Sequence, residues 1–198
     1  MKNILDLIRS YFSRLCDAFG WKYVAIIICI YGLNQGIGEA VLFTAQRYYY
    51  LDVLKTSAAR YTQIAGFTNI PWQIKAMYGM ISDSTPIYGL RRTPYCVGAG
   101  FIGTISALLL WLTGAGRNMA AVFLLFANLS IASPDVMIDA TTAEKAKTQP
   151  RLTADLQALC WGSLYFFGSF AQLASGYLVK PKVLGPRHLF AGIMLTSC

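Results

Sequence analysis

Ionisable side chains within long apolar stretches are the residues of this sequence whose types and spacing could do chemistry. They are Glu39, Lys75, Asp135 and Asp139. Asp135 and Asp139 stand four residues apart, which places both carboxylates on one face of a helix. A charged group is costly inside a membrane, so each of the four is a candidate for binding a solute or carrying a proton.

The positions of Lys75 and Asp135 favour a charge pair between two helices. Lys75 lies about 18 residues into its apolar stretch, and Asp135 about 24 Å along its own, at a rise of ~1.5 Å per residue. If both stretches enter the membrane from outside, the two side chains reach the same inner level. The pair could handle substrate or protons, or it could be a structural clamp. For Asp139, which is nearer the following loop, we expect the structural role.

Glu39 is the only charged residue of the first apolar stretch. A single acid in the outer half of a membrane span is a functional hypothesis by default, and here it suggests proton coupling. The alternative is an ion pair with Arg47 or Arg60 near the outer surface. The sequence favours the functional interpretation of Glu39 by a small margin.

The composition places these residues in a membrane protein. Of 198 residues, 56% are hydrophobic and only 13% are charged, whereas about a quarter of the residues of a soluble domain are charged. The net charge of +8 is divided among short segments between apolar stretches, which argues against a nucleic-acid surface. The five cysteines are widely spaced, without a Cys-x-x-Cys pair, so we expect neither a metal site nor a disulfide framework.

The apolar stretches predict an all-α bundle of five membrane spans and the start of a sixth, since a span needs about 20 residues. The expected spans are about 23–46, 57–81, 93–113, 119–141 and 155–179, with an incomplete sixth at 188–198. The second is the most polar and should line a wet cavity. A charged loop is expected at 142–152.

Residues 1–20 precede the bundle and carry apolar side chains at helical spacing. This pattern is typical of a helix that lies in the cytoplasmic membrane surface, with a frayed tail as the alternative. With the amino terminus inside, nine Lys and Arg lie on the inner side and seven on the outer. This bias has the expected sign but is small.

A turn after the second stretch carries a first resemblance. Gly79, Asp83, Gly89 and the pair Arg91–Arg92 resemble the loop that joins spans two and three of the major facilitator superfamily on the cytoplasmic side. Five additional residues separate Asp83 from Gly89, which departs from the general pattern. The resemblance implies that these residues form a conformational gate; the alternative is that their charges belong to an ordinary solvated loop.

Two longer strings resemble the folate–biopterin transporter family. They are PWQIKAMYGMISDSTPIYGLRRTPY at 71–95 and SPDVMIDA at 133–140. Members of this family have 12 spans in two halves, so the resemblance implies that the chain is the amino-terminal half, with its sixth helix truncated. It further implies secondary active transport of folates or pteridines by alternating access, with proton coupling through Glu39 and Asp135.

Polar and aromatic residues of the second stretch could bind such a solute. Asn69, Trp72 and Gln73 could stack on a flat pteridine or form hydrogen bonds with it. Ordinary helix packing accounts for them equally well. The partners implied are the solute, the lipid bilayer of a plasma membrane or an organelle envelope, and a missing carboxy-terminal half.

Other classes of function have less support. The sequence contains no catalytic nucleophile set, phosphate-binding loop or metal-ligand spacing, so we expect no enzyme activity and no cofactor. Two alternatives remain open. The chain could carry a different small organic solute, or it could be a truncated membrane interaction or regulatory protein that transports nothing.

Overall fold

The computed structural model describes residues 3–180 and 182–197, and most of these residues are helical. Within these ranges there is no strand, and a single isolated bridge joins Ile87 and Leu90. The all-α prediction is therefore confirmed. The helices are, in chain order, α1 Ile4–Phe19, α2 Trp21–Ile27, the π-helix η1 Ile28–Ile37, α3 Gly38–Tyr48, the π-helix η2 Tyr49–Val53, α4 Ala58–Thr68, α5 Ile70–Gln73, α6 Lys75–Ser84, α7 Thr93–Thr113, α8 Arg117–Thr148, the 3-10 helix η3 Pro150–Leu152, α9 Thr153–Leu178 and α10 Pro186–Ser197.

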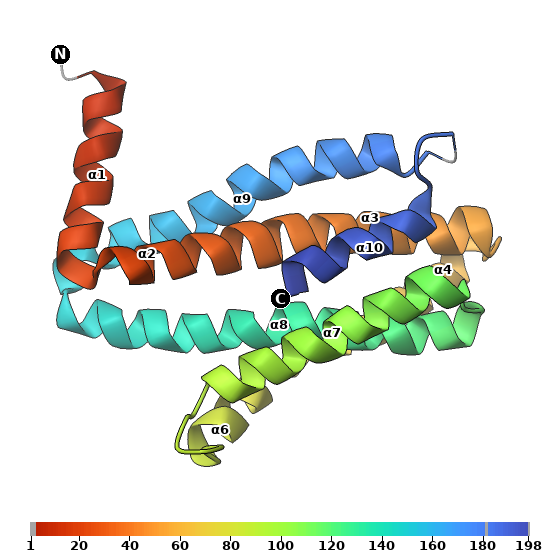
Figure 1. Cartoon of the computed structure of the whole chain (residues 1–198), viewed down its shortest axis with the longest axis horizontal. Coiled ribbons are helices and arrows are strands. Elements are labelled where there is room, and N and C mark those ends of the chain that lie inside the picture. Colours follow the sequence, from red (N-terminus) through yellow and green to blue (C-terminus); the bar gives the residue numbers. More distant parts are fainter. Residues whose placement is uncertain (1–2, 181, 198) are drawn as a thin grey trace.

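Long helices run side by side along one axis and form a bundle (Figure 1). The α9 helix packs on η1, α7 packs on α8, and α10 packs on both α7 and α3. One buried cluster fills the end of the bundle around Leu42, Leu124 and Phe190. A second cluster, around Ile27 and Leu156, includes residues of α1, α2 and α9.

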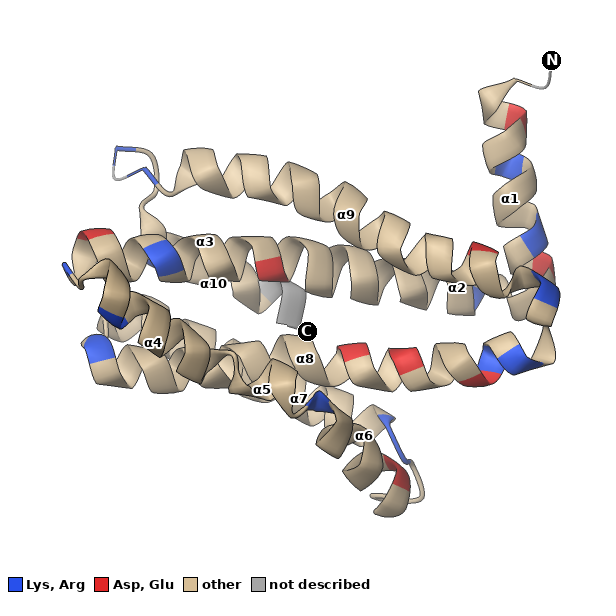
Figure 2. Ribbon diagram, turned by 180° about the vertical axis from the view of Figure 1, so that it is seen from behind, with Lys and Arg blue, Asp and Glu red and all other residues tan. Residues whose placement is uncertain are grey.

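Three helical stretches of the described residues are long and apolar enough to cross a membrane. They are Trp21–Val53, Thr93–Thr113 and Arg117–Thr148. The basic residues lie mostly near the ends of the long helices and in the connections between them. Acidic residues also occur along the middle of α3 and α8 (Figure 2). That the second, fifth and sixth expected spans also cross the membrane stays a prediction.

The second expected span is not one continuous helix. It is divided into α4, α5 and α6, with breaks at Asn69 and Ile74. Pro71 lies in the first turn of α5 and has no backbone N–H to donate to the preceding turn, where its ring also crowds the carbonyl of residue i−4. The proline explains the first break, and the pieces can differ in direction.

The fourth helix is longer than expected. The α8 helix continues through Thr148 with Pro134 inside it, so the prediction of a charged loop at 142–152 was wrong. Alanine, glutamate and lysine favour a helix even where their charges exclude it from lipid. Only Gln149 and η3 connect α8 to α9.

The amino-terminal segment is the helix α1, which stands nearly perpendicular to the bundle (Figure 1). Gly20 makes the corner with a φ of +86°, a backbone conformation that glycine adopts without a Cβ clash. Leu15 and Phe19 are buried where α1 meets the bundle, whereas Ile4 and Leu5 are exposed. The segment is thus a helix rather than a frayed tail, and its place in the membrane surface stays a prediction.

Candidate functional site

An ion-paired cluster joins the start of α6 to the middle of α8. Nζ of Lys75 lies 2.9 Å from Oδ2 of Asp135 and 4.0 Å from Oδ2 of Asp139. Asp135 is buried with 3% of its surface exposed, while about half of the Asp139 side chain is exposed, 48%. The predicted ion pair between Lys75 and Asp135 is confirmed. The same ammonium also lies within ion-pair distance of Asp139.

The π-helix η1 supplies the third side of this cluster. The hydroxyl of Tyr31 donates a hydrogen bond to Oδ1 of Asp139, and the buried side chain of Gln35 interacts with Asp135. Sequence reasoning missed both residues. The available signal was their spacing, since Tyr31, Gln35 and Glu39 follow one another at intervals of four.

Trp72 connects the short helix α5 to this cluster. Its indole N–H donates a hydrogen bond to Oδ1 of Asn128, at 3.2 Å, and Nζ of Lys75 lies 5.9 Å from the ring centroid. A cation at this distance is attracted by the negative face of the ring. Asn128 is a further residue that sequence reasoning missed.

Asn69 and Gln73, the other two predicted solute contacts, lie apart from these interactions. Gln73 is exposed on α5. The side-chain oxygen of Asn69 is buried at the break before α5 and has no hydrogen-bond partner among the described residues. Their role in solute binding stays a prediction.

Glu39 lies on α3 and lines a cavity of about 580 Å³ between α3 and α9. Among the ion pairs of the described residues, none joins Glu39 to Arg47 or Arg60. The alternative interpretation of Glu39 as a surface ion pair is therefore not realised in this structure.

Two of the predicted gate residues, Asp83 and Arg92, are in direct contact. The guanidinium of Arg92 binds both carboxylate oxygens of Asp83, at 2.9 and 3.2 Å. The same group donates to Glu144 at 2.7 Å and to Thr141 at 3.0 Å. Since these residues belong to α6 and α8 and Arg92 immediately precedes α7, one side chain holds three helix ends together. Arg91 is exposed beside it.

The pairing with Arg92 also favours the ionised form of Asp83, whose side chain is 43% exposed. Hydrogen bonds from the Arg92 guanidinium lower the pKa of the Asp83 carboxyl below its usual 3.8. The carboxylate is therefore ionised throughout the physiological range of pH. A planar guanidinium can bind a carboxylate through two parallel hydrogen bonds, which gives the contact a defined direction.

The two gate glycines serve different purposes. Gly89 has a φ of +79° and follows Tyr88 at +54°, and Ile87 and Leu90 exchange two backbone hydrogen bonds around them. This tight turn accommodates the additional residues between Asp83 and the basic pair. A Cβ on Gly79 would lie 3.5 Å from the side chain of Val136, an ordinary contact distance, so this glycine lies where α6 packs against α8.

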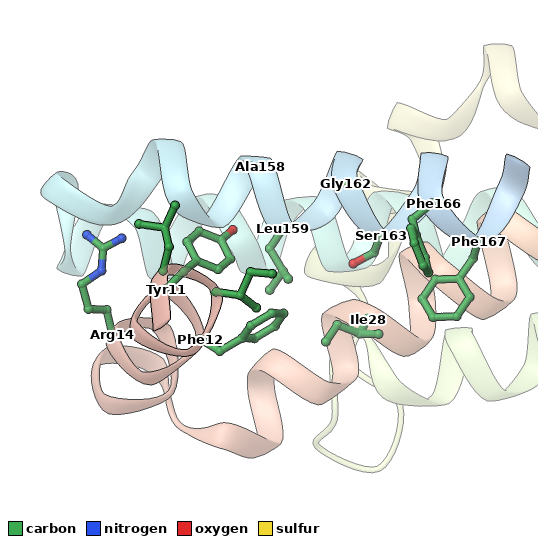
Figure 3. Close-up of a pocket in the computed structure, with 12 residues that line it drawn as sticks. Tyr11, Phe12, Arg14, Ile28, Ala158, Leu159, Gly162, Ser163, Phe166 and Phe167 are labelled. Atoms are coloured by element: carbon green, nitrogen blue, oxygen red, sulfur yellow. The ribbon is translucent and has the colours of Figure 1, made fainter. Parts of the chain in front are cut away.

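A larger cavity, of about 860 Å³, lies elsewhere, between α1, η1 and α9. Figure 3 shows that apolar side chains line it, with Arg14 at one end and Phe166 and Phe167 at the other. A binding site for a polar solute needs several polar groups that converge on it. The ion-paired cluster and the cavity beside Glu39 are therefore better candidates. Within the described ranges no group of His, Cys, Asp and Glu could hold a metal ion.

Sequence comparisons connect these features to known proteins. Residues 35–193 match the BT1 family. The "Probable folate-biopterin transporter 2" of Arabidopsis thaliana is 32% identical over 190 residues, which cover 96% of this chain and 38% of the relative. The "Folate-biopterin transporter" of Synechocystis sp. is 31% identical over 167 residues, 84% of this chain and 33% of the relative.

A more distant relative is the "Folate transporter 2" of Plasmodium falciparum, which is 24% identical over 162 residues, 77% of this chain and 35% of the relative. No solved structure matches the chain. The chain spans about a third of the length of these curated relatives, from 33% to 38%. The match over most of its residues, together with helices that can cross a membrane, shows that this integral membrane protein belongs to the BT1 family, a family of transporters and not of enzymes.

Proposed function

We propose that the chain forms the amino-terminal half of a secondary active transporter for folates and related pteridines. The observation that carries the proposal is an alignment to a relative named as a probable folate-biopterin transporter. It covers 96% of the chain, at 32% identity. The match covers 38% of that relative, less than half of its length, which leaves room for a second set of spans. The other half would provide the opposite wall of the solute cavity.

The order of the helices supports a six-span half of the major facilitator type. The spans would be the rod from α2 to η2, the broken helix from α4 to α6, and then α7, α8, α9 and α10. In transporters built from repeats, the solute binds near the middle of the bilayer, and broken helices contribute to its site. The divided second helix, which carries Trp72 and Lys75, is such an element. Transport would proceed by alternating access as the halves rock about the site.

The ion-paired cluster is our candidate for proton coupling. Lys75 lies between the buried Asp135 and the partly exposed Asp139. Asp135, the coupling candidate, shares the ammonium of Lys75 with Asp139, so a loss of charge at Asp135 would weaken the attraction between α6 and the buried part of α8. Protonation and the position of α6 would then be linked. Glu39 is the second coupling candidate.

The contacts of Arg92 support a gate at the inner end of the bundle. A group that ties α6, α7 and α8 together through four hydrogen bonds can stabilise one conformation of the bundle relative to another. Opening would require these charged groups to separate and to bind water instead. The gate would thus favour the conformation in which the contacts are formed.

Uptake by the full protein in liposomes tests the proposal. Wild-type protein should accumulate labelled folate and biopterin when the pH differs across the membrane. Asp135→Asn and Asp139→Asn should lose this accumulation but retain exchange of labelled for unlabelled solute at equal pH, because exchange needs no net movement of protons. Absence of folate and pterin uptake by the wild type would refute the solute class. Unchanged accumulation in both variants would refute the coupling assignment alone.

A further inference from the structure

A groove with opposite charges at its ends runs along α3 and α9. Two adjoining cavities form it, of about 580 and 510 Å³, and both are lined by Phe43 and Gln172. Glu39 lines the first cavity and Arg47 lines the second. We call this feature the α3–α9 groove. Each cavity has the size of an ordinary small-molecule site, since such sites measure roughly 300–1,000 Å³.

The two charged ends have no ion-pair partners within the described part of the chain. Neither Glu39 nor Arg47 takes part in an ion pair there, although both belong to the stretch Trp21–Val53 that can cross a membrane. Ionisable groups in such stretches usually pair with one another or face a ligand pathway. Eight residues of α3 separate the two, or about 12 Å at ~1.5 Å per residue, which is too far for direct contact.

Hydrogen bonds join the two walls of the groove at its middle. Gln172 donates a hydrogen bond to the hydroxyl of Thr44 at 3.2 Å, and Ser175 donates to the same oxygen at 3.2 Å. These contacts hold α9 against α3. Near Glu39, a Cβ on Gly36 would lie 2.8 Å from the carbonyl oxygen of Leu164. Gly36 belongs to η1, which continues into α3, so η1 and α9 approach here as closely as the backbone allows and fix the distance between the walls at the Glu39 end.

We infer that the α3–α9 groove binds one folate molecule lengthwise, an assignment that rests on the proposed folate and pteridine class of solute. The pterin ring of folate presents a ring N–H beside a 2-amino group, two donors that match the two acceptor oxygens of the Glu39 carboxylate. The glutamate part of folate carries carboxylates that match the guanidinium of Arg47. The aromatic ring between these parts lies along Phe43.

This arrangement separates recognition of the pterin from recognition of the glutamate. Biopterin has the same donor edge as folate but no glutamate, so it should use Glu39 and not Arg47. A lumazine analogue has an oxygen in place of the 2-amino group and presents an acceptor to Glu39. Sites built to hydrogen-bond a group reject analogues that leave a buried polar group unpaired. The wild type should therefore prefer pterins to lumazines.

Equal-pH exchange by the full protein in liposomes, with folate, biopterin and biolumazine as ligands, tests the assignment. Glu39→Gln should weaken folate and biopterin about tenfold, as expected for the loss of a charged hydrogen bond, and should shift preference toward biolumazine because an amide can donate to its oxygen. Arg47→Gln should weaken folate about tenfold and biopterin less than twofold. The matched control is Arg60→Gln, on α4 outside the groove lining, which should change neither ligand more than twofold.

The outcomes distinguish this inference from the proposed function. A wild type that exchanges neither folate nor biopterin refutes the solute class on which the inference rests. A wild type that exchanges both, with Arg47→Gln weakening both equally or neither, overturns the assignment of Arg47. Unchanged selectivity between biopterin and biolumazine in Glu39→Gln overturns the assignment of Glu39. If Glu39→Gln does not fold, Glu39→Asp, which withdraws the carboxylate by one methylene, should weaken both pterins while Arg47-dependent selectivity is preserved.

Discussion

Nζ of Lys75 lies 2.9 Å from Oδ2 of Asp135 and connects the first residue of α6 to a carboxylate that is buried on α8. The two partners are unequal, because 40% of the Lys75 side chain is exposed and only 4% of the Asp135 side chain. Water can therefore compensate for a lost partner at the lysine but not at the aspartate.

This inequality predicts that Lys75→Met destabilises the protein more than Asp135→Asn does. The methionine leaves a buried carboxylate without its cation, for a loss of about 2 kcal/mol, below the ~3–5 kcal/mol of a fully buried pair because the site is partly wet. Asp135→Asn leaves a lysine that can turn to water or to Asp139. Thermal unfolding in one detergent measures both, with the exposed Lys147→Met as control. Equal losses for the two variants would contradict the argument.

Replacement of Arg92 by lysine should weaken the gate although the charge is kept. A single ammonium cannot reproduce the two bonds to Asp83 together with those to Glu144 and Thr141, since lysine lacks the planar fork of donors. We expect faster cleavage by protease in the connection between α6 and α7 of Arg92→Lys. Arg91→Lys is the matched control at the neighbouring exposed position, and an equal increase there would show that the fork geometry is unimportant.

The lowered pKa of Asp83 predicts how the gate responds to pH. Because the Asp83 pKa lies below 3.8 in the folded protein, the pair contributes stability above the ordinary carboxyl pKa and loses it as pH falls through the lowered value. Between pH 5 and 8 the gate should therefore be constant. Arg92→Gln should change the rate of uptake while the shape of its pH profile in that range is unchanged. A pH profile that shifts in Arg92→Gln would contradict this assignment of charge.

A methyl group at Gly36 should disrupt the contact between η1 and α9. The new Cβ would lie 2.8 Å from the Leu164 carbonyl oxygen and 3.1 Å from the Gly168 nitrogen. Backbone atoms cannot move as side chains do, so we expect a loss of about 1–3 kcal/mol. Gly162→Ala is the control on α9, because its Cβ would meet nothing within 4 Å. Thermal unfolding of the two variants checks the prediction, and a stable Gly36→Ala protein would refute the close approach.

Residues whose neighbours follow from helix geometry were predictable from the sequence. Four-residue spacing placed Asp135 and Asp139 on one face, and the rise per residue brought Lys75 to the level of Asp135. Long-range partners that depend on how helices pack were not predictable. The spacing of Tyr31 from Glu39 indicates only that they share a face, and nothing local to Tyr31 or Asn128 indicates that these residues meet Asp139 and Trp72, respectively.

The structure differs from the predicted helix boundaries at charged residues in the fourth helix and at a proline in the second. Charged residues after Asp139 suggested that the fourth helix ends with its apolar stretch, but Glu and Lys are good helix formers and α8 continues beyond it to Thr148. In the second stretch, Pro71 carried the signal for a break, although the apolar pattern suggested one helix. The π-helical winding of η1 has no recognisable signal in the sequence.

The broken second helix has a mechanical consequence. Lys75 fixes the first turn of α6 to α8, and Asp83 near its last turn is fixed through Arg92 to Glu144 of the same helix. Because α6 is held to α8 at both of its ends, the two helices move together while these contacts are formed. While both contacts are formed, any swing of α4 relative to α8 is absorbed at the breaks Asn69 and Ile74, so the second helix does not move across the bundle as a single unit.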